Sequence, residues 1–275
     1  MNTSLRALQL KARHQVYTLL SGHNLSKLYG EGYDFAELRE YQVGDDIRKI
    51  NWTITAKLGK PYIKELHANR ELSVVVAALM DGTLYFDQDN EKQEKLAEAA
   101  MILGYAAQHN ADLFTGLRYT QKGVKVTLPT KQLYLVENFS SELFDIPLLS
   151  TQLKIQPALQ DIFKRVHKAS LLFVIGDFLE EVDLSLLAQK HEVIAIVIRK
   201  REEESPSVLG EIHFRSPQSL MKIDTYFGKK SIARYQQKLR ENDRRNAEHF
   251  SRFGIRSVKI FTDEESVSRL ATLFR

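Results

Sequence analysis

The chain contains no cysteine among its 275 residues. This absence excludes disulfides, thiolate metal sites, iron–sulfur clusters and cysteine nucleophiles, and it favours a reducing compartment. Long apolar runs are also lacking, because the longest, Leu72 to Met80, is far shorter than the roughly 20 residues that a membrane-spanning helix needs. The segment Met1 to Lys11 has no apolar run of the signal-peptide type. We therefore expect a protein without a transmembrane segment, located in the cytoplasm.

The usual catalytic motifs are absent as well. No histidine stands in an HExxH arrangement, and no serine lies in a GxSxG elbow. Gly30-Glu31-Gly32 lacks the third glycine of a dinucleotide-binding fingerprint. Gly228-Lys229-Lys230-Ser231 lacks the earlier glycine of a nucleotide-binding P-loop, because Ile223 stands at that position. These absences predict that the chain is not an enzyme.

Charge is distributed unevenly along the chain, although the net charge is only +4. Residues 1–70 carry 11 basic and 7 acidic side chains, residues 71–227 carry 16 and 22, and residues 228–275 carry 12 and 6. The basic ends are either ordinary solvated surface or a binding surface for an anionic partner such as nucleic acid. Acidic residues interspersed in the C-terminal region argue against nucleic acid.

Two apolar patterns alternate after residue 71. Continuous apolar runs that are typical of strands buried on both faces lie at 72–80, 171–175 and 193–198, and a last strand is predicted at 257–261. Helical spacing occupies 92–109, 133–144, 159–167, 229–253 and 264–274. Two antiparallel pairs are predicted, 113–120 with 124–128 and 211–214 with 220–224. The pattern predicts an α/β domain with a mostly parallel sheet and helices on both faces, preceded by a helix at 5–20 and by loops and short strands.

Two acidic residues follow predicted neighbouring strands. Asp81 and Asp177 each come directly after a buried run, and Thr83 lies just beyond the first. Ligands of open α/β sheets collect at the carboxyl ends of the strands. Such oxygen donors suit Mg²⁺, the one cofactor that we consider. The alternative is that Asp81-Gly82 and Gly176-Asp177 are ordinary turn residues.

A long motif in the first part of the chain indicates a family. It comprises Ser21-Gly22-His23, Gly30-Glu31-Gly32-Tyr33-Asp34-Phe35, Leu38-Arg39-Glu40-Tyr41, Gly44-Asp45-Asp46-Ile47-Arg48 and Ile50-Asn51-Trp52. This signature resembles that of the bacterial family called domain of unknown function fifty-eight. The resemblance continues past Asp81, Ser150-Thr151 and Asp177 to the helix around Tyr235, so it covers nearly the whole chain.

The resemblance implies a von Willebrand factor A-like (Rossmann-like) domain at 71–275 behind a family-specific segment at 1–70. Similar domains hold a divalent metal through a DxSxS strand end with a later Thr and Asp. Carried over, this pattern falls on Asp81, Thr83, Tyr85, Thr151 and Asp177. Tyr85 departs from it, because a phenol oxygen held at ring length cannot take the place of a serine hydroxyl. We therefore expect a degenerate, metal-free binding surface, with Tyr85 as an interface contact.

The charged residues of the N-terminal motif have two interpretations. Arg39, Asp45, Asp46 and Arg48 either pair with one another in a structural ion-pair network or face outward as a docking patch. Family members are often encoded beside AAA+ ATPases of the MoxR type. The resemblance thus implies a non-enzymatic adaptor that works with a MoxR-type ATPase in remodelling or maturing another protein complex. Binding of nucleic acid or another anionic surface by the basic ends is the alternative function.

Overall fold

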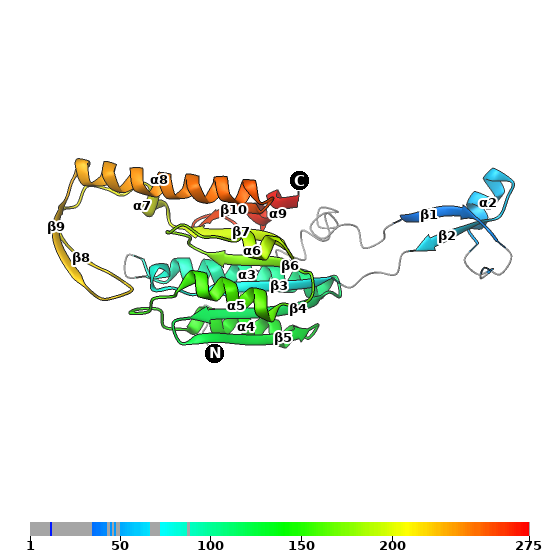
Figure 1. Cartoon of the computed structure of the whole chain (residues 1–275), viewed down its shortest axis with the longest axis horizontal. Coiled ribbons are helices and arrows are strands. Elements are labelled where there is room, and N and C mark those ends of the chain that lie inside the picture. The colour runs from blue at the N-terminus through cyan, green and yellow to red at the C-terminus, as the bar shows by residue number, and fades with distance from the viewer. Residues whose placement is uncertain are drawn as a thin grey trace.

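The computed structural model describes residues 12, 35–42, 45, 47, 50–66, 72–86 and 89–274. Most of these residues form one domain around a six-stranded sheet in the order β10-β7-β6-β3-β4-β5 (Figure 1). Its strands are β3 (Ser73–Leu79), β4 (Leu113–Thr120), β5 (Gly123–Thr130), β6 (Leu171–Gly176), β7 (Glu192–Arg199) and β10 (Arg256–Phe261). All neighbouring pairs are parallel except β4 with β5, which lies at the edge.

Helices cover both faces of this sheet, because its inner strands are apolar on both sides. Val74, Val76 and Ala78 of β3 pack in one buried cluster with α3 (Glu91–His109), α4 (Leu133–Asp145) and α9 (Ser266–Ala271), which η3 (Thr272–Phe274) follows. Val75 and Ala77 face the second cluster, with α5 (Ile155–Arg165), α6 (Ser185–Ala188) and α8 (Lys229–Arg252). The predicted α/β fold class, with a mostly parallel sheet between two helical layers, is confirmed.

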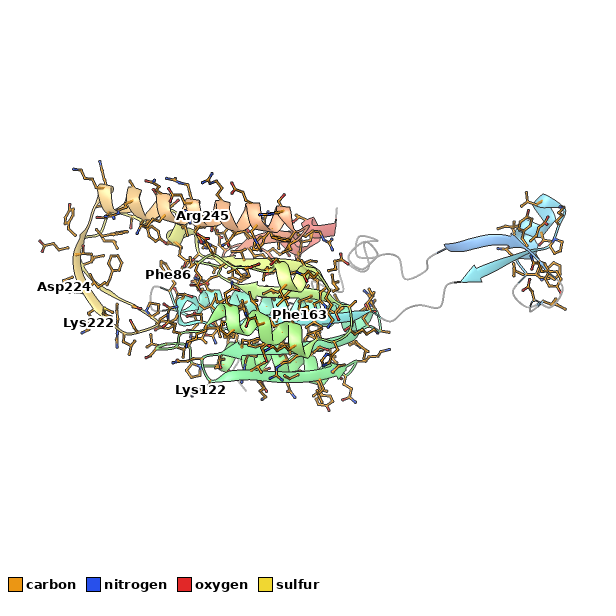
Figure 2. All side chains as sticks on the ribbon, in the orientation of Figure 1. Phe86, Lys122, Phe163, Lys222, Asp224 and Arg245 are labelled. Carbon is orange, nitrogen blue, oxygen red and sulfur yellow. The ribbon has the colours of Figure 1, made fainter. Side chains whose placement is uncertain are left out.

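A hairpin projects from this domain before α8. It consists of β8 (Gly210–Arg215) and β9 (Lys222–Phe227), which pair antiparallel in the predicted region. Figure 2 shows Lys222 and Asp224 on β9 at the end of the molecule where α8 begins. The turn at 216–221 runs back toward the sheet, where Pro217 accepts a hydrogen bond from the backbone N–H of Ser150.

The segment before residue 71 contributes a small unit of its own. Strands β1 (Phe35–Glu40) and β2 (Tyr62–Leu66) pair antiparallel, and α2 (Trp52–Leu58) lies between them in the chain. Asn51 caps the start of α2, and Gly59 ends it with a left-handed φ of 73°. Figure 1 shows this unit at one end of the molecule, apart from the six-stranded sheet. Of the helix predicted at 5–20 only Ala12 is described, and it is helical and buried in the first core cluster.

The structure adds short helices that sequence periodicity did not indicate. Helices α7 (Arg201–Glu204), α6 and α2 all lie outside the helices predicted from the sequence. Four residues are too few to display a helical period. Of these short helices, α7 carries the buried Glu203 to the carboxyl edge of the sheet, where β3 and β6 end.

Candidate interaction site at the carboxyl edge of the sheet

Asp81 and Asp177 lie together, as the sequence predicts. Strands β3 and β6 are parallel neighbours, with Ala78 opposite Ile175, so the residues that follow them emerge at the same edge. This is also the point where chain order reverses, since β4 and β5 extend to one side and β7 and β10 to the other. Both aspartates are buried, with 6% of each residue exposed.

The carboxylate of Asp81 is bound by protein N–H groups on both oxygens. Its Oδ1 accepts from the backbone of Thr83 at 3.3 Å and from Nε2 of Gln218 at 2.9 Å, and its Oδ2 accepts from the backbone of Leu153 at 3.2 Å. Burial raises the pKa of Asp81, the nearby charge of Asp177 adds to this rise, and the three hydrogen bonds oppose it.

Asp177 has a different environment, because a lysine contacts it. The Nζ of Lys92 lies 3.0 Å from Oδ2 of Asp177, and the Lys92 residue is fully buried. Burial alone would raise the pKa of Asp177, but the Lys92 ammonium, the Thr83 side chain and Arg199 together hold this pKa below its ordinary value. Asp177 is therefore an ionised carboxylate at neutral pH, even though it is buried.

The same lysine binds two further oxygens. Its Nζ donates to the backbone oxygen of Thr83 at 2.9 Å and to Oε1 of Glu203 at 2.7 Å. Glu203 is 2% exposed, and its Oε2 accepts from the backbone N–H of Lys200 at 2.8 Å at the start of α7. We call Lys92 with the groups of Thr83, Asp177 and Glu203 that it contacts the lysine site.

Arg199 supports this arrangement from the end of β7. It is fully buried, and its Nη2 donates to the backbone oxygen of Asp177 and to Oδ1 of Asp243, each at 3.1 Å. The second carboxylate oxygen of Asp243 accepts from Lys259 at 2.8 Å. The residues at the end of β6 are thus held by cations from α3 and from β7.

Thr151 lies at the edge but does not present its hydroxyl there. That hydroxyl donates to the backbone oxygen of Leu148 at 2.5 Å, whereas the Thr151 backbone oxygen accepts from Gly82 at 3.1 Å. The hairpin turn packs against the same residues: a Cβ on Gly82 would lie 2.5 Å from the oxygen of Thr151 and 3.0 Å from that of Pro217. Only glycine fits at position 82, so the turn at 216–221 directly covers this part of the edge.

These donors do not fit a divalent metal. Both oxygens of Asp81 accept N–H groups, the hydroxyl of Thr151 is directed to Leu148, and an ammonium already lies against Asp177. Over the described part of the chain, no three His, Cys, Asp or Glu residues are grouped so that they could hold a metal ion. The possible Mg²⁺ role of Asp81, Thr83, Thr151 and Asp177 is therefore not supported by this geometry, for a reason other than the Tyr85 substitution.

The structure places only some of the other predicted site residues. Tyr85 follows η2 (Gly82–Leu84) at the same edge and is partly exposed. Arg39 lies in β1, although its side chain is outside the described part, as are residues Asp46 and Arg48. Asp45 is described, and its Oδ2 accepts from the backbone of Gln42 at 2.8 Å. The ion-pair network and the N-terminal docking patch both stay predictions.

Sequence reasoning missed four residues of the edge: Lys92, Arg199, Glu203 and Gln218. A signal existed for Lys92, because it lies four residues before Leu96 and seven before Ala99, on the apolar stripe of the predicted helix. A lysine on that stripe predicts a buried, paired ammonium. No comparable signal identified Glu203 within the run of three glutamates, or Gln218 in a turn.

The chain is similar to several known proteins. The protein Rv1480 of Mycobacterium tuberculosis (strain H37Rv) is 25% identical over 229 residues, which cover 78% of this chain and 70% of that protein. Among solved structures, BatB of Bacteroides thetaiotaomicron is 9% identical with a TM-score of 0.41, covering 74% of this chain and 96% of that one. The SpRpn10 VWA domain is 10% identical with a TM-score of 0.35, covering 73% and 93%.

Within the described residues, the structure contains no helix that combines the length and apolar character needed to cross a membrane.

The family model described as "Protein of unknown function DUF58" matches residues 37–246, which include β3, β6, the lysine site and the β8–β9 hairpin. Because this match spans most of the chain, the protein belongs to the DUF58 family.

Proposed function

We propose that the protein is a non-enzymatic interaction module that works with a MoxR-type AAA+ ATPase in remodelling or maturing another protein complex. The observation that carries the proposal is a cluster of exposed apolar side chains on the β8–β9 hairpin, whose turn contacts the carboxyl edge. Phe214, Met221 and Ile223 are 40%, 62% and 57% exposed. Adjacent exposed apolar residues are typical of protein-binding surfaces.

Register places two of these residues on one side of the hairpin. Phe214 and Ile223 are cross-strand partners, so their side chains extend from the same face of the two-stranded ribbon. The ring of Phe214 also packs edge-on against Phe227, with 5.1 Å between centroids, which fixes its position. We call Phe214, Met221 and Ile223 the hairpin patch, and we propose it as the surface that the partner contacts.

The charged groups of the edge support a binding role more than a catalytic one. A general acid or base must reach a substrate proton, directly or through one water. Asp81, Asp177 and Lys92 are instead buried, and each makes hydrogen bonds to other groups of the protein. Their role in the proposal is to hold the edge and the hairpin turn in one geometry.

The test uses the purified full-length chain and the MoxR-type ATPase of the same organism, with a non-hydrolysable ATP analogue. We expect a stable complex by size-exclusion chromatography, and an affinity at least about tenfold lower for the Phe214→Glu/Ile223→Glu variant, as for loss of an interface anchor. Leu128→Glu is the matched control, because Leu128 is 73% exposed on edge strand β5. Absence of a complex with the wild-type chain, or equal binding by the hairpin variant, would contradict the proposal.

The alternative partner, nucleic acid, is not supported by the surface of the C-terminal region. Several of its basic side chains are paired with carboxylates: Arg245 with Glu181, Arg256 with Glu192, and Lys259 with Glu204 and Asp243. Figure 2 shows Arg245 on α8. A phosphate backbone would have to compete with these acids. DNA binding that weakens steeply with salt in a two-salt titration would favour the alternative over our proposal.

A further inference from the structure

The carboxyl edge contains a cation that is part of the chain. We propose that the ammonium of Lys92 is the resident cation of this edge, in place of the divalent metal that similar domains hold, so that the edge requires no metal. This inference concerns the edge alone and does not depend on which partner the protein binds.

The coordination of Lys92 is complete. An ammonium group has three N–H donors. The structure provides three oxygen acceptors for it: the backbone of Thr83 at 2.9 Å, Asp177 at 3.0 Å and Glu203 at 2.7 Å. These acceptors come from the turn after β3, the end of β6 and helix α7, so one side chain of α3 connects three separate segments.

The buried carboxylates of the lysine site are paired without a metal. Asp177 and Glu203 share the Lys92 ammonium, and Arg199 binds the backbone oxygen of Asp177 together with a carboxylate oxygen of Asp243. Buried charges are tolerated only when they are paired and hydrogen-bonded. A divalent cation beside Asp177 would be repelled by the Lys92 ammonium, which is 3.0 Å from the same carboxylate.

A built-in cation also accounts for the departure of the sequence from the metal-binding pattern. If no metal is held, residue 85 has no ligand role, and tyrosine is as acceptable there as serine. In the same way, the Thr151 hydroxyl is free to bind the oxygen of Leu148. Tyr85 at this position is thus compatible with the lysine site.

The experiment measures Mn²⁺ binding and thermal unfolding of the full chain. We expect the wild-type protein to bind no Mn²⁺ in electron paramagnetic resonance titrations and to keep its Tm in the presence of a chelator. Lys92→Ala leaves Asp177 and Glu203 without their shared partner, and we expect its Tm to fall by about 10 °C. The vacated space should let Mn²⁺ or methylammonium restore part of this loss.

Lys95→Ala is the matched control. Lys95 lies one turn further along α3 and is also buried and paired, with Glu98 at 2.7 Å, but the structure assigns it to another cluster with Glu264 and Ser266. Its loss of stability should not be restored by either cation.

Mn²⁺ binding by the wild-type chain that disappears in Asp177→Asn would overturn the proposal. The proposal would also be overturned if the Lys92→Ala protein folds, is no less stable than Lys95→Ala, and shows no rise in Tm with Mn²⁺ or methylammonium. If Lys92→Ala does not fold, the wild-type titration decides alone.

Discussion

The side chain of Gln218 donates a hydrogen bond of 2.9 Å to Oδ1 of Asp81, 137 residues earlier in the chain. This contact links the turn of the β8–β9 hairpin to the strand end that defines the carboxyl edge. The hairpin patch is therefore attached to the rigid sheet at its turn as well as through α8. Its orientation depends on a small number of polar contacts that can be removed one at a time.

Removal of the Gln218 amide should loosen the hairpin turn. In Gln218→Ala, Asp81 loses a charge-assisted hydrogen bond, and we expect a loss of about 1–2 kcal/mol in the free energy of unfolding. Amide hydrogen exchange at 216–221 should become faster while exchange in β3 stays slow. Gln189→Ala, at an exposed glutamine after α6, is the control and should change neither quantity. Unchanged exchange at 216–221 would show that the contact does not hold the turn.

Gly82→Ala tests the close approach of three segments at the edge. The new Cβ would lie 2.5 Å from the backbone oxygen of Thr151, and backbone atoms cannot move away as a flexible side chain can. We expect a destabilisation of about 1–3 kcal/mol in chemical denaturation. Gly176→Ala is the matched control, because its Cβ would meet nothing nearer than 3.4 Å. The prediction fails if both substitutions have the same effect.

Arg199→Met should be far more harmful than the same substitution two residues later. Arg199 is fully buried, and its loss leaves the backbone oxygen of Asp177 and one oxygen of Asp243 without a donor, so we expect about 3–5 kcal/mol of destabilisation. Arg201 pairs with Asp263 at the surface, where such pairs contribute little, so Arg201→Met should change stability only slightly. Urea unfolding of both variants measures the difference. Similar losses would mean that the buried contacts of Arg199 do not stabilise the edge.

His191 should make stability depend on pH. It is 5% exposed, and burial, with the charge of Lys190, lowers its pKa below the ordinary value. Below about pH 6.5 the unfolded chain therefore binds a proton that the folded chain does not. As the pH is lowered, the free energy of unfolding then falls by up to about 1.4 kcal/mol per pH unit. We expect His191→Leu to reduce this slope in denaturation curves from pH 7 to 5. His167→Leu, at an exposed histidine, should keep the wild-type slope.

Much of the fold could be predicted because the inner strands are recognisable in the sequence. Strands β3 and β6 are continuous apolar runs, and each ends in a glycine–aspartate pair, so the meeting of Asp81 and Asp177 follows from parallel pairing alone. The position of the Lys92 ammonium between β3, β6 and α7 could not be predicted in this way. Lys92 meets Glu203 across 111 residues of sequence, and no local pattern specifies which glutamate of α7 turns inward.

The covalent attachment of Lys92 to α3 has a physiological consequence. A bound metal leaves when its free concentration falls below the dissociation constant, so metal-dependent adhesion varies with nutrient supply and competing chelators. A side-chain ammonium has no such dissociation equilibrium, and its effective concentration at Asp177 and Glu203 is set by the folded chain. A cell that is starved of magnesium or manganese would keep this edge intact.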